Sequence, residues 1–459
     1  MNIRRINTAL ALVGASCVLM STSGYAQTAG TTANSNAMQT YFINISNPFD
    51  PTTVCGDWFN QNAGTDSPRA KIQASTQQGI DNLGLACDAY FRQVAQGKPP
   101  VTAVAFMDAI TPDDFVAFKL DALLFAQSEN DNAMDRMQAL RRKHAPSDKS
   151  ASAQQSVLGG GASADESSDM LTKKLGLWFR LNNSGGKKDV TALTGKLDNS
   201  QFAGAVGMDY RLGAETVLGG SLGYRNAKAK FGDSGAQGSM DSKTFNISGY
   251  FSSYVYKSMY LDTVLNYGNI KYNTHRNVLD LSVPPVPYTA FGKTNGKTLS
   301  GGVALGYEFA PNAWTITPSV HYFYTDSKTD AFEEEGSGAY DLNYGKQHYQ
   351  SSSARLDLNV SYAVNGNSAV WLPHFRTEMI KEFGANIDTF DVRFVNASNP
   401  TLAPLPVQLD KMDDLYFRVT LGVSAQFRND IAAYLDYQQL VGFDKVTFYN
   451  VVAGMRLQF

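Results

Sequence analysis

The sequence lacks the long apolar runs with which helical membrane proteins cross a bilayer. Beyond residue 26, none of its 459 residues falls in a run of about 18 apolar residues, which excludes transmembrane helices. It also lacks a strong excess of charge, because the net charge is −3, and this gives no support for a nucleic-acid partner. Aromatic residues, in contrast, make up 12% of the chain. Such a composition fits a soluble protein, but it fits equally a membrane β-barrel, in which lipid-facing and lumen-facing residues alternate.

Cysteine is also scarce. Cys17 lies within residues 1–26, which are typical of a signal peptide: a basic start, a short apolar stretch and small residues at Gly24–Ala26. A lipoprotein signal at Cys17 would need Leu where the chain has Gly14. Cys55 and Cys87 remain after processing, and an oxidising periplasm favours a disulfide between them over two free thiols.

Composition divides the remaining chain into three parts. Residues 27–145 form a polar to amphipathic N-terminal region. Residues 146–169 are rich in Ser, Gly and Ala and predict a flexible linker. From residue 170 to residue 459, apolar and polar residues alternate with period two, which is the spacing of a strand with one apolar face.

The N-terminal region predicts mainly helix. Thr111 and Pro112 suit the start of a helix, and acidic residues follow them. We expect Ser128–Asn132 to break this helix, and a second helix to end near His144. Another helix is expected over residues 69–96. Two arrangements remain open: a small helical domain joined by the disulfide, or partly extended chain with a helix that fills a pore.

The C-terminal part predicts about twelve long strands. In Leu415–Phe427 every odd position is apolar, and every even position is polar, glycine or tyrosine. Each run is long enough for the roughly 9–11 residues that a tilted strand needs to cross a membrane. The runs lie near 171–181, 199–212, 215–229, 241–254, 258–273, 297–309, 313–325, 349–364, 368–383, 412–427, 430–440 and 446–459.

The connections between these strands alternate in length. The short ones are 213–214, 255–257, 310–312, 365–367 and 428–429. The longest of the others are 274–296, 326–348 and 384–411. Short periplasmic turns and long external loops are typical of an outer-membrane barrel. We therefore predict an all-β fold: a twelve-stranded antiparallel transmembrane β-barrel, preceded by a small, mainly α-helical N-terminal region, and closed so that no strand edge faces lipid.

Several short segments resemble the autotransporter β-domain. They are Gly207–Tyr210, Leu218–Tyr224, Leu305–Phe309 and the terminal Val451–Phe459. The resemblance implies type V secretion: a monomeric barrel in the outer membrane of a Gram-negative bacterium that secretes or displays its own N-terminal passenger at the cell surface. It also implies export by the Sec machinery, insertion by the barrel-assembly machinery, and contact with outer-membrane lipid and lipopolysaccharide. The assembly signal would comprise the outward face of the last strand, Tyr449, Val451, Met455, Leu457 and Phe459.

The chain departs from this family in the segment before its first strand. The family usually has a helix there, whereas here the helical signal ends near His144 and residues 146–169 follow. The passenger is short and has no repeats that would build a β-helix. The alternative hypothesis is therefore an outer-membrane pore whose N-terminal region is a plug or a periplasmic domain.

No pattern in the sequence predicts an enzyme, a cofactor or a metal site. Gly232–Gly235 resembles the nucleophile motif of serine proteases, but no passenger histidine is placed to serve it. The five histidines have no metal-ligand spacing, and Glu333–Glu335 is interpreted as a solvated acidic loop. Asn130–Asn132 lacks the Asn–Asn step at which some autotransporters cut themselves. Charged residues on the predicted lumen face are expected to form salt bridges around whatever fills the pore: Arg211, Arg225, Glu308, Arg355, Asp357, Arg376, Glu378, Arg418 and Arg456.

Overall fold

The computed structural model describes most of the C-terminal part and selected pieces of the N-terminal region. The described residues are 33–42, 53–56, 87, 90, 109–112, 116–141, 174–213, 215–232, 237–279, 286–383, 389–396, 402–410, 413–427 and 430–458. The predicted signal peptide, the predicted linker and Phe459 lie outside them. Within the described residues, no helix combines the length and apolar character needed to cross a membrane.

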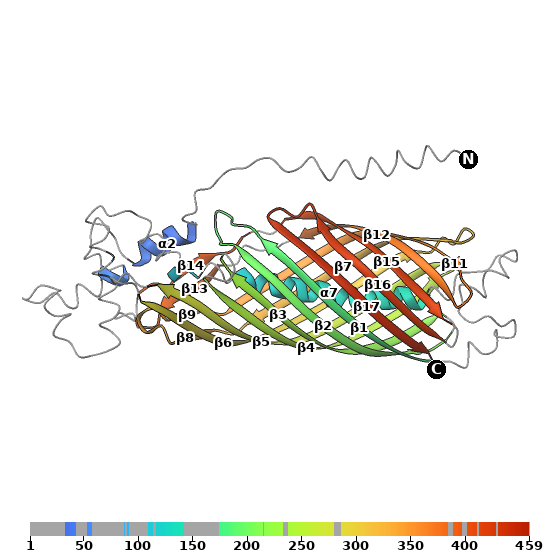
Figure 1. Cartoon of the computed structure of the whole chain (residues 1–459), viewed down its shortest axis with the longest axis horizontal. Coiled ribbons are helices and arrows are strands. Elements are labelled where there is room, and N and C mark those ends of the chain that lie inside the picture. The colour runs from blue at the N-terminus through green and yellow to red at the C-terminus, as the bar shows by residue number, and fades with distance from the viewer. Residues whose placement is uncertain are drawn as a thin grey trace, which may run out of the picture. The chain divides into compact units, whose positions relative to one another are not determined.

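Twelve long strands form a closed antiparallel barrel (Figure 1), as the sequence predicts. They are β1 Leu175–Lys188, β2 Leu197–Arg211, β3 Thr216–Phe231, β4 Gly238–Tyr256, β5 Met259–Leu279, β6 Pro287–Tyr307, β7 Trp314–Thr329, β10 Gln347–Tyr362, β12 Ala369–Phe383, β15 Leu415–Phe427, β16 Ile431–Val441 and β17 Val446–Gln458. The last strand pairs with the first, from Gly176 opposite Gln458 to Lys188 opposite Val446. This pairing satisfies the backbone groups that an open edge would leave unpaired in lipid.

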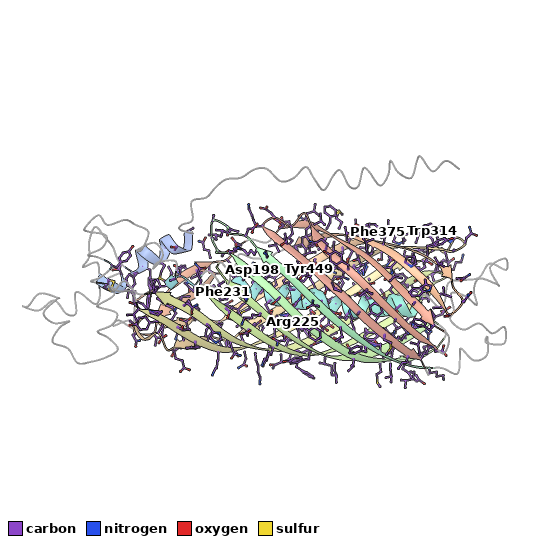
Figure 2. All side chains as sticks on the ribbon, in the orientation of Figure 1. Asp198, Arg225, Phe231, Trp314, Phe375 and Tyr449 are labelled. Atoms are coloured by element: carbon purple, nitrogen blue, oxygen red, sulfur yellow. A yellow bond between two sulfur atoms is a disulfide. The ribbon has the colours of Figure 1, made fainter. Side chains whose placement is uncertain are left out.

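Side chains alternate between the two faces of the barrel wall. Trp314, Phe375 and Tyr449 are exposed on the outer face, whereas Arg225 is buried inside (Figure 2). Along a strand, successive residues point to opposite faces, so an apolar outside and a polar inside follow from the same period-two pattern. The exterior is therefore suited to lipid, and the interior is suited to a polar occupant.

The short turns agree with the predicted ones, but the long connections contain more structure than predicted. Strands β5 and β6 continue to Leu279 and Pro287, so most of the predicted loop 274–296 is an extended hairpin. Four short strands lie in the other long connections: β8 Phe332–Glu335, β9 Leu342–Tyr344, β13 Thr389–Phe394 and β14 Leu405–Gln408. They pair in the order β8–β9–β13–β14, and β8 also pairs with β6. A two-residue strand, β11 Val364–Asn365, and the 3-10 helix η4 Gly338–Tyr340 complete the connections.

Helix α7, Val116–Arg141, runs through the lumen of the barrel (Figure 1). The predicted break at Ser128–Asn132 is wrong, because the helix is continuous for 26 residues. Near its start, Lys119 Nζ lies 3.4 Å from the carbonyl oxygen of Asp410, in a long connection. Near its end, Arg136 binds Asp209, which lies beside the short turn between β2 and β3. The helix therefore enters at the long-loop end and ends at the short-turn end.

Candidate functional site

Helix α7 packs closely against the wall that β4, β5, β6 and β7 form. Small polar side chains such as Ser242, Thr244 and Ser300 line this wall and are buried. At Gly268 the wall has no side chain at all, and an added Cβ would lie 2.6 Å from the ring of Phe125. Glycine is needed there because only a residue without a Cβ lets the helix approach so closely.

The polar side chains of Ser128–Asn132, which the sequence predicts as a helix breaker, form hydrogen bonds with amide side chains of the barrel wall. Asn246 donates a hydrogen bond of 2.6 Å to Glu129. Asn266 donates one of 2.7 Å to Asn130. Asn182, on β1, reaches both Ser128 at 3.2 Å and Asn132 at 3.3 Å. In water these polar side chains would bond to the backbone and destabilise a helix. Inside the barrel the side chains of the wall are their partners, so the helix is stable.

Four arginines of the barrel bind two carboxylates on the next part of the helix. Asp131 accepts a 2.6 Å hydrogen bond from Arg355 on β10, and both its oxygens bind Arg418 on β15. Asp135 accepts hydrogen bonds of 2.8 Å from Arg180 on β1 and of 2.7 Å from Arg376 on β12. We call Arg180, Arg355, Arg376 and Arg418 the arginine girdle.

The helix supplies the negative charge that the girdle needs. Two barrel carboxylates belong to the same network: Glu378 lies 2.5 Å from Arg418 Nε, and Asp357 lies 2.5 Å from Arg376. Three of the four arginines contact these two barrel acids, and Asp131 and Asp135 bring the number of acids in the network to four. Removal of one partner of a buried ion pair leaves an unpaired charge and costs about 3–5 kcal/mol. The acids of the helix and the arginines of the barrel therefore stabilise one another.

Two further ion pairs hold the helix on either side of the girdle. Towards the long loops, Arg225 binds Asp121, which also accepts hydrogen bonds from Ser242 at 3.1 Å and Tyr272 at 3.3 Å. Towards the short turns, Arg136 Nε donates to Asp209 at 2.9 Å. The helix is thus tied to the barrel along its length.

All nine charged residues predicted on the lumen face are buried inside the barrel. Five join the girdle network, and Arg225 binds the helix. Arg456 donates to the carbonyl oxygen of Ala139 at 3.4 Å and to Gln426 at 2.9 Å, and Glu308 accepts from Tyr254 at 2.7 Å. Sequence reasoning missed Arg180, although it alternates with the outward Phe179 and Leu181. It also missed the acids of α7, which have no periodic signal.

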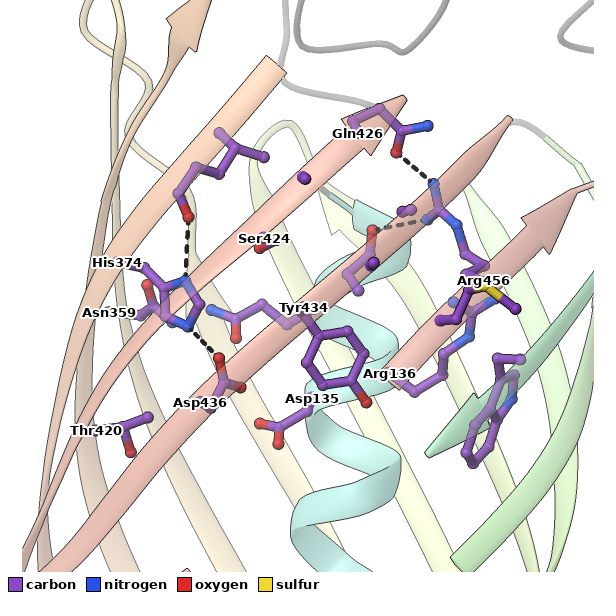
Figure 3. A pocket seen from close by; sticks show the side chains of 18 of the residues that line it. Asp135, Arg136, Asn359, His374, Thr420, Ser424, Gln426, Tyr434, Asp436 and Arg456 are labelled. Carbon is purple, nitrogen blue, oxygen red and sulfur yellow. Dashed lines mark hydrogen bonds and ion pairs between the residues drawn. The ribbon is translucent and has the colours of Figure 1, made fainter. Parts of the chain in front are cut away.

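A cavity of about 100 Å³ remains beside the helix near the short-turn end (Figure 3). Asp135, Arg136, Tyr434 and Arg456 line it. On its far side, His374 Nε2 lies 3.1 Å from Asp436. Such a volume holds a few water molecules. In the described part of the chain, no group of three or more His, Cys, Asp or Glu side chains is arranged to hold a metal ion.

At the long-loop end, pieces of the N-terminal region pack on the short strands. Helix α2, Ala33–Phe42, contributes Met38 and Phe42 to a buried cluster with Phe394 and Leu405. The rings of Phe42 and Phe394 lie 5.7 Å apart. The same cluster contains Tyr90 and the disulfide between Cys55 and Cys87, whose S–S distance is 2.08 Å. We call this assembly of α2, residues 53–56, 87 and 90, and strands β8, β9, β13 and β14 the long-loop cap.

Buried polar contacts fasten the cap to the barrel. Arg276 on β5 binds Glu334 on β8 and donates to the carbonyl oxygens of Tyr340 at 2.7 Å and Ala109 at 3.0 Å. The interpretation of Glu333–Glu335 as solvated is therefore wrong for Glu334, which is buried beside Arg276. Burial raises the pKa of the Tyr41 hydroxyl to about 12, against the opposing effect of Arg393.

The residues of the predicted assembly signal that the structure describes lie on the outer face of β17. Tyr449 and Met455 are exposed, and Val451 and Leu457 are half-buried. Their inward neighbours Asn450, Val452 and Arg456 are buried. Phe459 lies outside the described residues.

A closed twelve-stranded barrel of outer-membrane type, with a helix of its own N-terminal part in the lumen, defines a class of translocator proteins. The model of one family, the autotransporter β-domain, matches residues 177–438, more than half of the chain. The protein belongs to the autotransporter family, and its barrel is an outer-membrane translocator domain of a Gram-negative bacterium. Translocator barrels of this family depend on outer-membrane insertion machinery and are not themselves enzymes.

Solved structures and a curated protein also resemble the chain. The translocator domain of the autotransporter NalP from Neisseria meningitidis matches with 16% identity and a TM-score of 0.49, over 74% of this chain and 100% of that one. The β domain of the Bordetella autotransporter BrkA matches with 19% identity and a TM-score of 0.44, over 62% of this chain and 100% of that one. Serotype-specific antigen 1 of Mannheimia haemolytica is 24% identical over 131 residues, which are 28% of this chain and 13% of that protein.

Proposed function

We infer that this protein carries its own N-terminal region through the outer membrane and keeps it displayed, with α7 as tether and plug. The observation that supports this most is the direction of α7. The helix starts among the long connections and ends beside the short turns. Long loops of such barrels face the exterior and short turns face the periplasm, so the chain before α7 belongs outside.

The long-loop cap supports display over release. Residues Met38, Phe42 and Tyr90 are buried against strands of the barrel's own connections. Arg276 then holds the backbone at Ala109, seven residues before α7 begins at Val116. These contacts would oppose the release of a passenger, whereas a retained passenger is stabilised by the apolar surface that it buries.

The competing function, an open pore for small solutes, agrees less well with the lumen. Helix α7 fills it, and the cavity left at the short-turn end measures about 100 Å³. Solute passage would require the helix to leave, which would strip Asp131 and Asp135 from the arginine girdle.

The remaining assignments follow from this proposal. Residues 1–26 direct export through the Sec machinery, residues 27–145 are the passenger with its tether helix, and residues 146–169 are a linker. The protein acts as a monomer, meets lipopolysaccharide around the barrel, and is inserted by the barrel-assembly machinery. The passenger serves as a surface structure rather than an enzyme, and the name of the Mannheimia haemolytica relative, an antigen, agrees with surface exposure.

Cysteine labelling of intact cells with a membrane-impermeant maleimide tests the topology. Ala33, at the start of α2, is exposed and becomes the reporter as Ala33→Cys. Lys293→Cys on the extended hairpin is the exterior control, and Glu215→Cys in the short β2–β3 turn is the periplasmic control; both positions are exposed. We expect Ala33→Cys to react in intact cells, as Lys293→Cys does. Reaction only after permeabilisation, as for Glu215→Cys, would reject the proposal.

A further inference from the structure

Two carboxylates of α7 have a spacing that matches the arginine girdle. Asp131 and Asp135 are four residues apart, so they lie on one face of the helix. Each binds two arginines, and the four arginines come from four different strands, β1, β10, β12 and β15. The barrel thus gathers one positive charge from each of four strands around one turn of helix.

We propose that the arginine girdle is an arrest site, which recognises the Asp131–Asp135 pair and sets the register at which the chain stops moving outward. This inference rests on the proposed function, because only a chain that moves through the pore needs a stopping point. It adds a recognition role for four named barrel residues and a two-residue signal in the helix.

The signal is unique within α7. The helix contains four acids, Asp121, Glu129, Asp131 and Asp135, and only the last two stand four residues apart. An extended chain would place these two carboxylates at roughly 13 Å from each other, at about 3.3 Å per residue. A helix brings them to about 6 Å along its axis, at 1.5 Å per residue. The girdle therefore binds the pair only when this segment has become helical.

The girdle also provides the driving force for arrest. Until the pair arrives, Arg355, Arg376 and Arg418 share two barrel carboxylates, Glu378 and Asp357. Arg180 contacts neither of these acids and donates to the side-chain oxygen of Asn182. As the helix fills the lumen and excludes water, arginines without partners become costly, and their attraction to the incoming carboxylates grows as the local dielectric falls. Segments of the chain that lack paired acids gain nothing at this position and pass on.

Other contacts of the helix discriminate less between registers. Glu129 accepts hydrogen bonds from the amides of Asn132 and Asn246, and Asn130 accepts one from Asn266. Amide contacts of this kind can be replaced by neighbouring polar groups or by water. The pairs at Asp121 and Asp209 each involve one arginine.

The register can be read by cross-linking inside the full-length protein in cells. Asn130 and Asn266 are 2.7 Å apart at their side-chain amides, so Asn130→Cys with Asn266→Cys reports the native register. Ala126→Cys with Asn266→Cys reports a helix displaced by one turn, about 6 Å, towards the short-turn end. Both reporters are scored only in folded, heat-modifiable barrels, and their barrel sequence is identical.

Moving the signal is the decisive variant. Gln127→Asp with Asp135→Asn keeps the number of acids and places the pair at positions 127 and 131. We expect the 126–266 cross-link to rise several-fold and the 130–266 cross-link to fall by a similar factor. Removal of the signal by Asp131→Asn with Asp135→Asn should lower the 130–266 cross-link. The helix should then be spread over several registers, so the 126–266 cross-link should not replace it. The matched control is Glu129→Gln, which changes an acid of the same helix that lies outside the girdle, and it should keep the native cross-link.

Retention of the native cross-link in both the shifted and the neutralised helix would overturn the proposal, because the register would then be set elsewhere. Loss of the native cross-link in Glu129→Gln to the same extent would overturn it as well, because any acid would then suffice. Failure of the proposed function looks different: Ala33→Cys would stay unlabelled in intact wild-type cells, whatever the cross-links show.

Discussion

Arg276 Nη1 donates a 3.0 Å hydrogen bond to the backbone carbonyl of Ala109. Ala109 precedes α7 in the sequence, whereas Arg276 follows it. The same guanidinium binds Glu334 and the carbonyl oxygen of Tyr340. One buried side chain therefore joins the barrel, the loop strands and the segment that leads into α7.

Replacing Arg276 by Gln should loosen the long-loop cap. The substitution leaves Glu334 as an uncompensated buried carboxylate, and removal of one partner of such a pair costs about 3–5 kcal/mol. We expect faster proteolysis of the N-terminal region on intact cells with an unchanged barrel. Lys271→Gln is the matched control, because Lys271 is exposed on the same strand. Equal protease sensitivity of the two variants would contradict the role given to Arg276.

Adding a methyl group at Gly268 should displace α7. The new Cβ in Gly268→Ala would lie 2.6 Å from the Phe125 ring, and overpacking of this kind typically costs about 1–3 kcal/mol. The full-length variant is expected to show more frequent openings in planar bilayers, and Phe125→Leu should restore closure. Gly249→Ala serves as control, because a Cβ there meets nothing within 4 Å. If Gly249→Ala opens the pore as often as Gly268→Ala, the close approach is irrelevant.

The barrel without its helix should prefer anions. Deleting residues 27–141 removes Asp131 and Asp135 and leaves the arginine girdle facing Glu378 and Asp357. We expect reversal potentials in a salt gradient to indicate anion selectivity, and Arg418→Gln to reduce it. A cation-selective pore would show that other lumen charges dominate.

Removing Phe459 should impair insertion into the outer membrane. Tyr449 and Met455 form an exposed apolar face on β17, and in the sequence Phe459 stands an even number of residues after both. Surface levels measured by immunoblot should fall in the deletion strain and stay normal in Gln458→Ala. Unchanged levels after the deletion would refute a part for Phe459 in assembly.

Alternation predicted the barrel and most of its charged lining. Arg355, for example, precedes the outward Leu356, and the apolar side of the strand identifies the lumen side. The extended β5–β6 hairpin was missed because its outward residues, such as Asn273 and His275, are polar, so the period-two contrast disappears beyond the membrane. The helix through Ser128–Asn132 was missed because propensity assumes water, whereas Asn182, Asn246 and Asn266 provide the partners here. Those partners lie at least 50 residues away in sequence.

The displayed region stays attached to the barrel only if α7 is an uncut tether. The direct measurement is a denaturing gel of Ala33→Cys protein that has been labelled from outside on intact cells. We predict that the label migrates with the barrel at the full length of the mature chain, because Asn130–Asn132 in α7 lacks the Asn–Asn step at which some autotransporters cut themselves. A labelled fragment that separates from the barrel on denaturation would contradict the account.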